Sequence, residues 1–521
     1  MSTRTAEPLW KPTPQRAANS RLADLTAILA RRTGRPVVDY ATAHRISVTE
    51  PEVFWGAVWD DCGVIAGSRG EHVLTPDADI SSIRWFPDAR LNYAENLLRR
   101  RDEGPAMIDH VRTVGPRRLS WSELHDLVSR MQQALRRHGV GAGDRVGVWA
   151  PGICEAQAAM LAAASIGAVF CAVPVDAGPD RVAAHLGAVA AKVLVTVDGH
   201  RGGAGTRDHL GLLGDLQGRL PAVTTCIVIP HLDPDVTVTT PGAVTLQAFT
   251  AEVEATRVAF ERLPFDHPLC VVFDTLDDGA SRPVVHRAGG VLLKHLVEHQ
   301  YHCDVRSGDR VLEWGAPDAM ARVWSASSMA SGATTVLVDP EPGNTGLQGL
   351  FGVLDDLDVT LLGVHVDHLA AMRRADLRPD VRHGLSALRT ITTYGPVPSP
   401  DLAGWVYGNV KADVHLAATV GGVDAGGALA GGDPTAAVWP GEAQRPALGV
   451  AVDVVDDDGV PLSPGRPGAI VSRCSFPSLP LGFWDDDDGS RFRADHFARI
   501  DGLWVGAGRA SWGTNGGIVG H

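Results

Sequence analysis

The sequence has no excess of basic residues and no basic stripe. Its 47 lysines and arginines are outnumbered by 61 aspartates and glutamates, which gives a formal net charge of -14 over 521 residues. Such a charge repels the phosphates of nucleic acids and of anionic membranes. The arginines are dispersed among acids, as on an ordinary solvated surface. We therefore expect neither nucleic acid nor a membrane as a partner.

The sequence also lacks paired cysteines and a secretory leader. Seven cysteines are scattered without C-x-x-C spacing, and several lie in apolar runs, which favours buried free thiols in a reducing compartment. Polar and proline-rich residues stand where an apolar signal segment would be. One uncharged run, residues 156–175, has the length of a membrane span, but its alanine-rich composition favours core elements. We predict a cytoplasmic protein.

The segment from Phe273 to His286, FDTLDDGASRPVVH, lacks what a phosphate-binding loop needs. It follows an apolar run at residues 268–272, which predicts a buried strand, and precedes a helical stretch at residues 289–297. A loop in this setting binds phosphate through glycines, small hydroxyl residues and a cation. Here Asp277 and Asp278 stand instead, and a carboxylate ~5 Å from a phosphate charge costs about 3 kcal/mol at an effective dielectric of about 20. The segment predicts that ATP does not bind unless a metal intervenes.

Helical and strand periodicities alternate along most of the chain. Residues 121–138 carry apolar side chains at helical spacing, and short apolar runs at residues 145–149 and 191–197 predict strands. This alternation predicts a parallel sheet covered by helices. Residues 448–455 and 469–472, separated by a D-D-D-G turn, predict a hairpin in a smaller β-rich unit.

Six segments of the chain carry a family resemblance. They are FWGAVWDDCGV at Phe54, LNYAENLL at Leu91, GVGAGDRVGVWAP at Gly139, MLAAASIGAVF at Met160, HRAGGVLLKHLVEHQYHCDVRSGDRV at His286 and SFPSLPLGFWDDDDG at Ser475. In this order they resemble acetoacetyl-CoA synthetases, members of the adenylate-forming superfamily. The resemblance implies an α/β fold, the large N-terminal domain of the adenylate-forming enzymes, with two helix-covered, mostly parallel sheets and a smaller β-barrel-like subdomain. It divides the chain into an N-terminal extension (1–110), the sheet subdomains (111–445) and a β-rich subdomain (446–521).

The resemblance also implies a two-step reaction, in which a carboxylate is activated with ATP to an acyl-adenylate and the acyl group then passes to coenzyme A. The family's phosphate loop, close to Y-S-S-G-T-T-G-x-P-K, corresponds to residues 273–282, where only Thr275, Gly279 and Arg282 keep its character. The family's S-G-G-T-D, whose threonine contacts phosphate and whose acid helps to hold magnesium, reads V-G-G-V-D here, so Val423 lacks the hydroxyl. Both differences predict weaker phosphate binding.

Two further family elements are expected to be missing. The motif W-x-H-G-D, whose aspartate binds the ribose hydroxyls, reads W-V-G-A-G here, with Gly508 in place of the acid. The family's small C-terminal domain supplies a catalytic lysine and would follow a hinge near Gly516, and the sequence ends at His521. We therefore expect this lid domain to be absent and neither ATP nor Mg²⁺ to bind.

The segments that line the acyl pocket in the family also differ here. G-T-S-A is G-V-H-V at residues 363–366, and S-T-G-S-P-L is T-T-Y-G-P-V at residues 392–397. His365, Asp367 and His368 could ligate zinc or iron or form an acid/base relay, or they could be packed or surface polar residues. In extended backbone His365 and Asp367 share one face while His368 points the other way, which disfavours a shared site.

Together these features predict an adenylate-forming scaffold that has lost ATP-dependent acyl-adenylation. Our leading hypothesis is a cleft repurposed for ATP-independent binding or chemistry of a small acyl or CoA-ester ligand, in specialised biosynthesis. Two alternatives stay open, namely a noncatalytic partner or regulatory module, and an acetoacetate:CoA ligase completed by another chain. The candidate catalytic residues are Asp277, Asp278, His286, His365 and Asp367. The candidate ligand-binding residues are Arg282, Tyr394, Gly395, Asp424 and Glu442, and no metal ligand is predicted.

Overall fold

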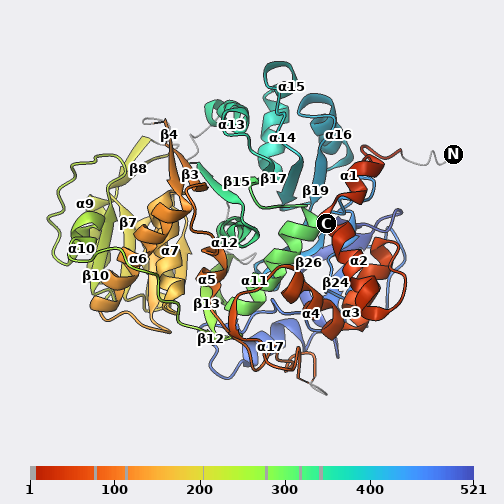
Figure 1. Ribbon diagram of the computed structural model, residues 1–521, viewed down its shortest axis with the longest axis horizontal. Helices are drawn as coiled ribbons and strands as arrows, with labels where there is room; N and C mark the ends of the chain where they lie inside the picture. Colours follow the sequence, from red (N-terminus) through yellow and green to blue (C-terminus); the bar gives the residue numbers. More distant parts are fainter. Residues whose placement is uncertain are drawn as a thin grey trace.

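The computed structural model describes residues 7–75, 79–111, 115–202, 205–275, 280–315, 319–338 and 344–521. Two large sheets organise this part of the chain, with helices between them and on their outer faces (Figure 1). The predicted α/β fold of two helix-covered, mostly parallel sheets is confirmed.

The first large sheet has eight strands in the order β11-β10-β7-β5-β6-β13-β14-β25. The first six are parallel, and β14 and β25 are antiparallel additions at one edge. In that order the strands are Ala243–Thr245, Thr225–Ile229, Val193–Val197, Arg145–Trp149, Val169–Val173, Pro268–Thr275, Ser281–Arg287 and Gly482–Phe483. The strand predicted at residues 145–149 is β5, and the one predicted at residues 191–197 begins two residues later, as β7. Continuous apolar runs suit these strands because both faces of the sheet are covered.

The second large sheet has seven strands in the order β19-β18-β17-β15-β16-β3-β4. Six are parallel, and β4 pairs antiparallel with β3 at the edge. In that order the strands are His415–Ala418, Thr390–Tyr394, Leu361–His365, Arg310–Trp314, Thr334–Val338, Pro105–Val111 and Gly115–Ser120. The carboxyl ends of these six parallel strands lie along the same side of the sheet.

Smaller sheets complete the strand inventory of the described residues. The predicted β-rich unit contains the antiparallel sheet β23-β24-β26-β27, in which β23 and β24 pair as expected. Its strands are Val452–Val455, Gly468–Ser472, Trp504–Trp512 and Ile518–Gly520. The other small sheets are β20-β21-β22 (Val420–Gly422, Gly427–Gly431, Arg445–Pro446), β1-β2-β12 (Ala66–Ser68, Arg90–Leu91, Leu263–Pro264) and the ribbon β8-β9 (Gly199–Gly202, Gly205–Asp208).

Helix α7 (Cys154–Ser165) lies between the two large sheets, where it contacts strands of both. Every residue of α7 except Glu155 is buried, and the alanine-rich surface lets α6 (Trp121–Arg137) pack closely along it. The run at residues 156–175 is thus α7 followed by β6 in the core. Among the described helices, none is long and apolar enough to cross a membrane.

The remaining helices differ in burial, since some lie on the surface whereas α11 (Ala288–Val297) is buried along its whole length. In Figure 1 the N-terminal helices α1 to α4 lie together beside the strands of the C-terminal β-rich unit. The N-terminal helices are α1 (Pro14–Ala18), α2 (Arg21–Thr33), α3 (Tyr40–Thr49), α4 (Pro51–Asp61) and α5 (Tyr93–Leu97). The central and C-terminal helices are α8 (Pro179–Ala188), α9 (Leu210–Arg219), α10 (Leu246–Thr250), α11 (Ala288–Val297), η1 (Glu298–His302), α12 (Ala319–Ser327), η2 (Ser328–Ser331), α13 (Asn344–Asp356), α14 (Val366–Arg374), α15 (Pro379–Arg382), α16 (Pro400–Asn409), η3 (Val423–Ala425) and α17 (Ser490–His496).

The structure corrects the prediction of a long loop from Phe273 to His286. Strand β13 continues to Thr275, and β14 begins at Ser281, so a β-hairpin rather than a loop precedes α11. The reason is packing, because Val284 and Val285 are buried and the ring of Phe273 stacks on His185 with centroids 3.8 Å apart. Asp277 and Asp278 lie outside the described residues.

Candidate active site

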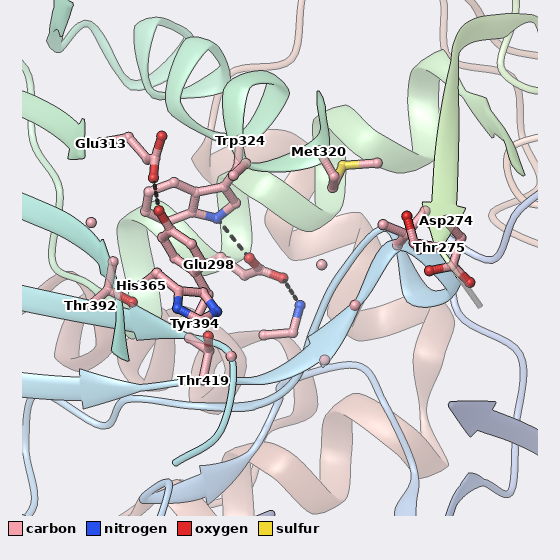
Figure 2. A pocket seen from close by; sticks show the side chains of 18 residues that line it. Asp274, Thr275, Glu298, Glu313, Met320, Trp324, His365, Thr392, Tyr394 and Thr419 are labelled. Carbon is pink, nitrogen blue, oxygen red and sulfur yellow. Dashed lines mark hydrogen bonds between the residues drawn. The ribbon is translucent and has the colours of Figure 1, made fainter. Parts of the chain in front are cut away.

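A cavity of about 600 Å³ opens at the carboxyl ends of the parallel strands of the seven-stranded sheet (Figure 2). Glu313 of β15, His365 of β17 and Tyr394 of β18 lie at or next to the last positions of their strands. Asp274 and Thr275, at the end of β13, form another part of the wall. The other described lining residues are Glu298, Met320, Ala321, Trp324, Gly363, Thr392, Gly395, Thr419, Gly421, Gly422, Val423, Gly427 and Ala428. Ligands of α/β proteins bind at such strand ends, so this cavity is the candidate active site.

Three carboxylates line the cavity, and each has a cation near it. The pairs are Glu298 with Lys294 (3.4 Å), Asp274 with Arg282 (2.7 Å), and Glu313 with the half-buried Arg322, whose pKa is lowered by desolvation, an effect that Glu313 opposes. A carboxylate without a cation or hydrogen bonds would be strongly disfavoured in such a wall. The wall is therefore polar but close to balanced in charge.

Glu298 accepts hydrogen bonds from two walls of the cavity. One carboxylate oxygen accepts a hydrogen bond from Nε1 of Trp324 at 2.8 Å, and the other accepts the backbone N–H of Ala428 at 2.8 Å. Lys294 lies one turn earlier and is fully buried, and this burial lowers the pKa of its ammonium while Glu298 opposes the shift. Glu298 opens η1, a π-helical turn that continues α11, and such turns are frequent at functional sites.

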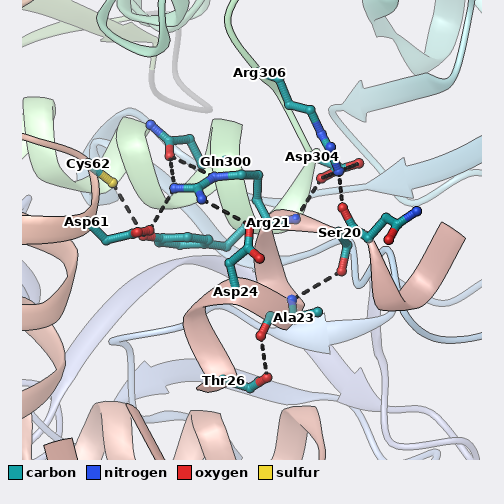
Figure 3. A network of polar contacts seen from close by, with 12 residues as sticks. Ser20, Arg21, Ala23, Asp24, Thr26, Asp61, Cys62, Gln300, Asp304 and Arg306 are labelled. Atoms are coloured by element: carbon teal, nitrogen blue, oxygen red, sulfur yellow. Dashed lines mark hydrogen bonds and ion pairs between the residues drawn. The ribbon is translucent and has the colours of Figure 1, made fainter. Parts of the chain in front are cut away.

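The N-terminal helices hold this π-helical turn from the outside (Figure 3). The guanidinium of Arg21 in α2 donates to Gln300 at 2.8 Å and to Asp61 at 2.7 Å. The hydroxyl of Tyr301 donates to the same Asp61 carboxylate at 2.6 Å. Because Gln300 and Tyr301 lie two and three residues after Glu298 in the same π-helical turn, this network fixes the backbone that presents Glu298 to the cavity.

His365 and Tyr394 form the wall on the β17–β18 side. His365 is the N-cap of α14, and its Nδ1 accepts the backbone N–H of Asp367 at 3.2 Å. Its ring meets that of Tyr394 edge-on, with centroids 5.4 Å apart, and the Tyr394 hydroxyl donates to Glu313. Gly395 has φ +89°, and a Cβ there would lie 2.5 Å from Nε2 of His365, so glycine is required for this close approach.

The wall on the β13 side carries ion pairs. Arg282 contacts Asp274 at 2.7 Å and Asp495 at 2.8 Å, and its guanidinium lies 4.8 Å from the centre of the Phe483 ring. Its side chain is 16% exposed, whereas that of Asp495 is 46% exposed. Val423 and the backbone of Gly421 and Gly422 line the cavity as well. This side therefore offers a cation with one partner, Asp274, in the cavity wall and another, Asp495, that is half-exposed.

Buried histidines lie behind the cavity between α11, η1 and the β20–β21 hairpin. Burial lowers the pKa of His286 to about 3, of His295 to about 3 and of His302 to about 4, so all three are neutral at pH 7. His295 contacts the Ser327 hydroxyl at 2.8 Å and the Gly426 carbonyl at 3.1 Å, and His302 contacts the Gly432 carbonyl at 2.7 Å. His295 and His302 therefore connect α11 and η1 to the segment that contains β21.

The structure brings some of the sequence-predicted site residues together and separates others. His365, Tyr394 and Gly395 line the cavity. His286 is buried against Gly426 and does not line it, and Asp424 is buried in η3. The side chain of Asp367 is 79% exposed and lies 3.5 Å from Nδ1 of His365 within the same helix start, because α14 begins at Val366 and the backbone is not extended there.

Arg282 and Glu442 are placed by their partners. Arg282 borders the cavity through Asp274. Glu442 accepts hydrogen bonds from the side chain of Asn515 at 2.9 Å and from the backbone N–H of Gly517 at 3.1 Å. It therefore fastens the segment before β27 and does not line the cavity.

Sequence reasoning missed Glu298 and Glu313, whereas Trp324 ends a segment, residues 315–324, that the family resemblance assigns to the acyl pocket. For Glu298 a signal was present, because K-H-L-V-E places a lysine and a glutamate four residues apart inside an otherwise apolar helical run. A charged pair in such a run is expected to be buried and paired, which points to a polar feature of the core. Glu313, inside the apolar strand β15, carried the same signal.

Comparisons with known proteins agree with this geometry. Residues 95–479 match the family described as AMP-binding enzyme, and residues 40–97 match the acetyl-coenzyme A synthetase N-terminus. The acetoacetyl-coenzyme A synthetase of Rhizobium meliloti (strain 1021) is 39% identical over 99% of this chain and 79% of its own length. The acetoacetyl-CoA synthetase of Gallus gallus is 30% identical over 95% of this chain and 75% of its own. The solved structure of acetoacetyl-CoA synthetase from Streptomyces lividans superposes with a TM-score of 0.92 at 33% identity, over 99% of this chain and 80% of that one.

These findings overturn two predictions. The prediction that ATP-dependent acyl-adenylation has been lost is wrong, because relatives that align over nearly the whole chain are ATP-using acyl-CoA synthetases. The prediction that ATP and Mg²⁺ do not bind is wrong for the same reason. The error came from weighing single loop residues, including two outside the described part of the chain, above a match that spans the fold. The chain belongs to the AMP-binding enzyme family and, within it, to the acetoacetyl-CoA synthetases.

Proposed function

We propose that this protein is an ATP-dependent ligase that joins acetoacetate to coenzyme A. Acetoacetate would react with ATP to give acetoacetyl-adenylate and pyrophosphate, and the thiol of coenzyme A would then displace AMP to form the thioester. The observation that supports this most directly is the similarity to the Streptomyces lividans acetoacetyl-CoA synthetase over 99% of this chain.

The cavity has two chemically different ends that suit this reaction. We call the part of the cavity lined by Trp324, His365, Thr392 and Tyr394 the acyl end. We call the part lined by Asp274 and Thr275, together with Arg282, which pairs with Asp274, the phosphate end. The acyl end combines an aromatic face with polar groups, as a short oxo acid requires. At the phosphate end Arg282 would exchange a carboxylate for a phosphate oxygen, which a guanidinium binds in the same geometry.

The residues present also fit a Mg²⁺ ion that arrives with the nucleotide. Magnesium bound with ATP uses one or two protein carboxylates and completes its shell with phosphate oxygens and water. Asp274 lines the phosphate end of the cavity as a carboxylate and could supply one such ligand. No group of three or more possible metal ligands is found among the residues described, and this mode of binding requires none. When bound, the ion would supply charge to balance the phosphates.

Roles for the remaining predicted site residues follow from their positions. His365, Tyr394 and Gly395 would contact the acyl group, and Arg282 would contact phosphate. Asp367 would serve only through the N-terminus of α14. His286, Asp424 and Glu442 would support the walls from behind, and Asp277 and Asp278, which lie outside the described residues, stay predictions.

The proposal also gives each part of the chain a role and places the protein in a cellular compartment. Residues 111–445 would supply both cavity ends, and residues 1–110 would brace η1, as the Arg21 network does. Residues 446–521 would carry the β-rich unit and Asp495. Seven free cysteines, six of them buried, support a reducing, cytoplasmic location, with small-molecule acyl and CoA ligands as the partners.

The test is a product assay with the full chain. Purified protein is incubated with acetoacetate, MgATP and coenzyme A, and AMP, pyrophosphate and acetoacetyl-CoA are measured by chromatography. We expect all three products in equal amounts, and none when acetoacetate or ATP is omitted. Absence of AMP and thioester from folded protein at millimolar substrates would refute the proposal.

A further inference from the structure

The hydrogen-bond donors at the acyl end are almost all committed to the protein itself. The Thr392 hydroxyl donates to the Ala417 carbonyl at 3.0 Å, and the Thr419 hydroxyl donates to the Thr393 carbonyl at 2.6 Å. Trp324 donates to Glu298, and Tyr394 to Glu313. A ligand's acceptor oxygen therefore has few side-chain donors to choose from at this end.

His365 is the exception, and its local bonding fixes which nitrogen carries the proton. Nδ1 accepts the backbone N–H of Asp367 at 3.2 Å as the cap of α14. A backbone N–H can only donate, so Nδ1 accepts it with its lone pair, and the neutral ring then carries its proton on Nε2. The carboxylate of Asp367 lies 3.5 Å from Nδ1, which is longer than an ordinary hydrogen bond, so the shorter contact with the backbone N–H sets the tautomer. The helix cap thus sets the tautomer of His365.

His365 lines the cavity, and Nε2 is on the side of its ring away from the backbone N–H that Nδ1 accepts. Within the described part of the chain it has no protein acceptor, and it lies beside Gly395, whose missing Cβ would stand 2.5 Å away. Both residues line the cavity, and Figure 2 shows the His365 ring next to Tyr394 and Thr419, away from Asp274 and Thr275. Glycine at position 395 keeps this donor accessible.

We propose that His365 determines substrate specificity by donating a hydrogen bond from Nε2 to the 3-oxo oxygen of the acyl substrate. This inference rests on the proposed ligase function and adds the group that distinguishes a 3-oxo acid from a simple alkanoate of the same length. Recognition of this kind discriminates well, because a substrate without the acceptor leaves a buried donor unpaired.

The test compares acetoacetate with butanoate, which has the same four-carbon chain and no 3-oxo group. His365→Phe keeps a ring of similar size and removes the donor. We expect kcat/KM for acetoacetate to fall about tenfold, with butanoate changed less than about twofold. His365→Gln places an amide N–H near the position of Nε2 and should keep most of the preference. His383→Phe is the matched control, because His383 pairs with Asp355 and does not line the cavity.

Two results would overturn the inference. One is an equal loss for both acids in His365→Phe, which indicates a structural role. The other is a wild-type protein without preference for acetoacetate. A nitrogen spectrum of protein labelled with ¹⁵N-histidine, assigned by comparison with His365→Gln, gives an independent readout, and a proton on Nδ1 would also overturn it.

Failure of the ligase proposal can be told apart from failure of this inference. If the wild-type protein forms no thioester from either acid, the ligase proposal fails, and binding of the two acids is then measured by calorimetry. Acetoacetate that binds about tenfold more tightly than butanoate, with the difference lost in His365→Phe, still supports the inference. Equal binding of the two acids refutes it.

Discussion

The two ends of the cavity are built in different ways. At the acyl end the polar groups are buried and bonded to one another, as in the contacts that Glu298 makes with Trp324, Ala428 and Lys294. At the phosphate end Arg282 is held by Asp274 and by the half-exposed Asp495. The polar groups at the acyl end are therefore held in place by bonds within the protein, whereas at the phosphate end Arg282 is paired with carboxylates that a ligand can replace.

This difference follows from burial. A buried charge without its partner costs several kcal/mol, because neither water nor another group can compensate it. An ion pair with one partner in solvent contributes only about 0.2–1 kcal/mol. Changes to groups at the acyl end that are bonded only within the protein, such as Glu298, should therefore act mainly on stability, and changes at the phosphate end mainly on nucleotide binding.

The largest effect is expected for Glu298→Ala. The substitution removes an acceptor from Trp324 and from Ala428, and it leaves the ammonium of Lys294 buried without a counter-charge. We expect the free energy of unfolding to fall by about 3–5 kcal/mol, measured by urea denaturation at pH 7.5.

A double-mutant cycle isolates the charge contribution. Lys294→Met fills similar volume without charge, so Glu298→Gln combined with Lys294→Met should be more stable than Glu298→Gln alone. Purely additive effects would show that the pair does not interact, and the contrast between the two ends would lose its basis.

The scaffold could be predicted from sequence more reliably than the cavity walls. The apolar run of β5 and the amphipathic pattern of α6 each specify one element, because burial of one face or of both faces leaves a periodic trace. Strand β14 was missed because polar residues surround its buried Val284 and Val285, which pack against partners distant in sequence. No local pattern in the sequence indicates contacts between residues that are far apart along the chain.

The site residues show the same limit. Tyr394 and Gly395 could be placed at the cavity because they end a strand in a recognisable segment. That His365 caps α14 was not predicted, since it depends on where β17 stops. The reading of Asp277 and Asp278 as decisive ignored that ion pairs such as Arg282 with Asp274 balance charge locally.

The phosphate end is tested next by Arg282→Ala. Charge-assisted hydrogen bonds contribute about 1.5–3 kcal/mol, so KM for ATP should rise about 10- to 100-fold while KM for acetoacetate changes less than about twofold. Steady-state kinetics with each substrate varied in turn measure both. Arg282→Lys is the matched control and should lie between wild type and alanine, because it keeps the charge and loses the planar fork. An equal rise of both constants would contradict the separation of the two ends.

The buried His286 predicts a dependence of stability on pH. Burial lowers its folded pKa to about 3, whereas the unfolded value is about 6.5, so between these values the unfolded chain binds the extra proton. The contribution of His286 to stability is therefore fully present above about pH 6.5 and is lost progressively as the pH falls toward 3. His286→Leu lacks this dependence on pH. Its free energy of unfolding relative to that of the wild type should therefore rise by about 1.4 kcal/mol between pH 8 and pH 5.5. A difference that stays constant across urea titrations at the two pH values would refute this.

The smallest effect is expected for Asp495→Asn, and it tests whether the phosphate end exchanges partners. Asp495 is 46% exposed and contacts Arg282 at 2.8 Å, so its removal should lower stability by less than about 1 kcal/mol. In the variant one carboxylate fewer competes with phosphate for Arg282, so KM for ATP should decrease about two- to fivefold. This decrease should be smaller at high salt, because salt already screens the Arg282–Asp495 pair of the wild type. The kinetic assay is run at 50 and 300 mM NaCl with Asp485→Asn as control, because Asp485 pairs with Arg491 and does not contact Arg282. A rise in KM for ATP would mean that Asp495 orients Arg282 for phosphate, and the phosphate end would then be preformed like the acyl end.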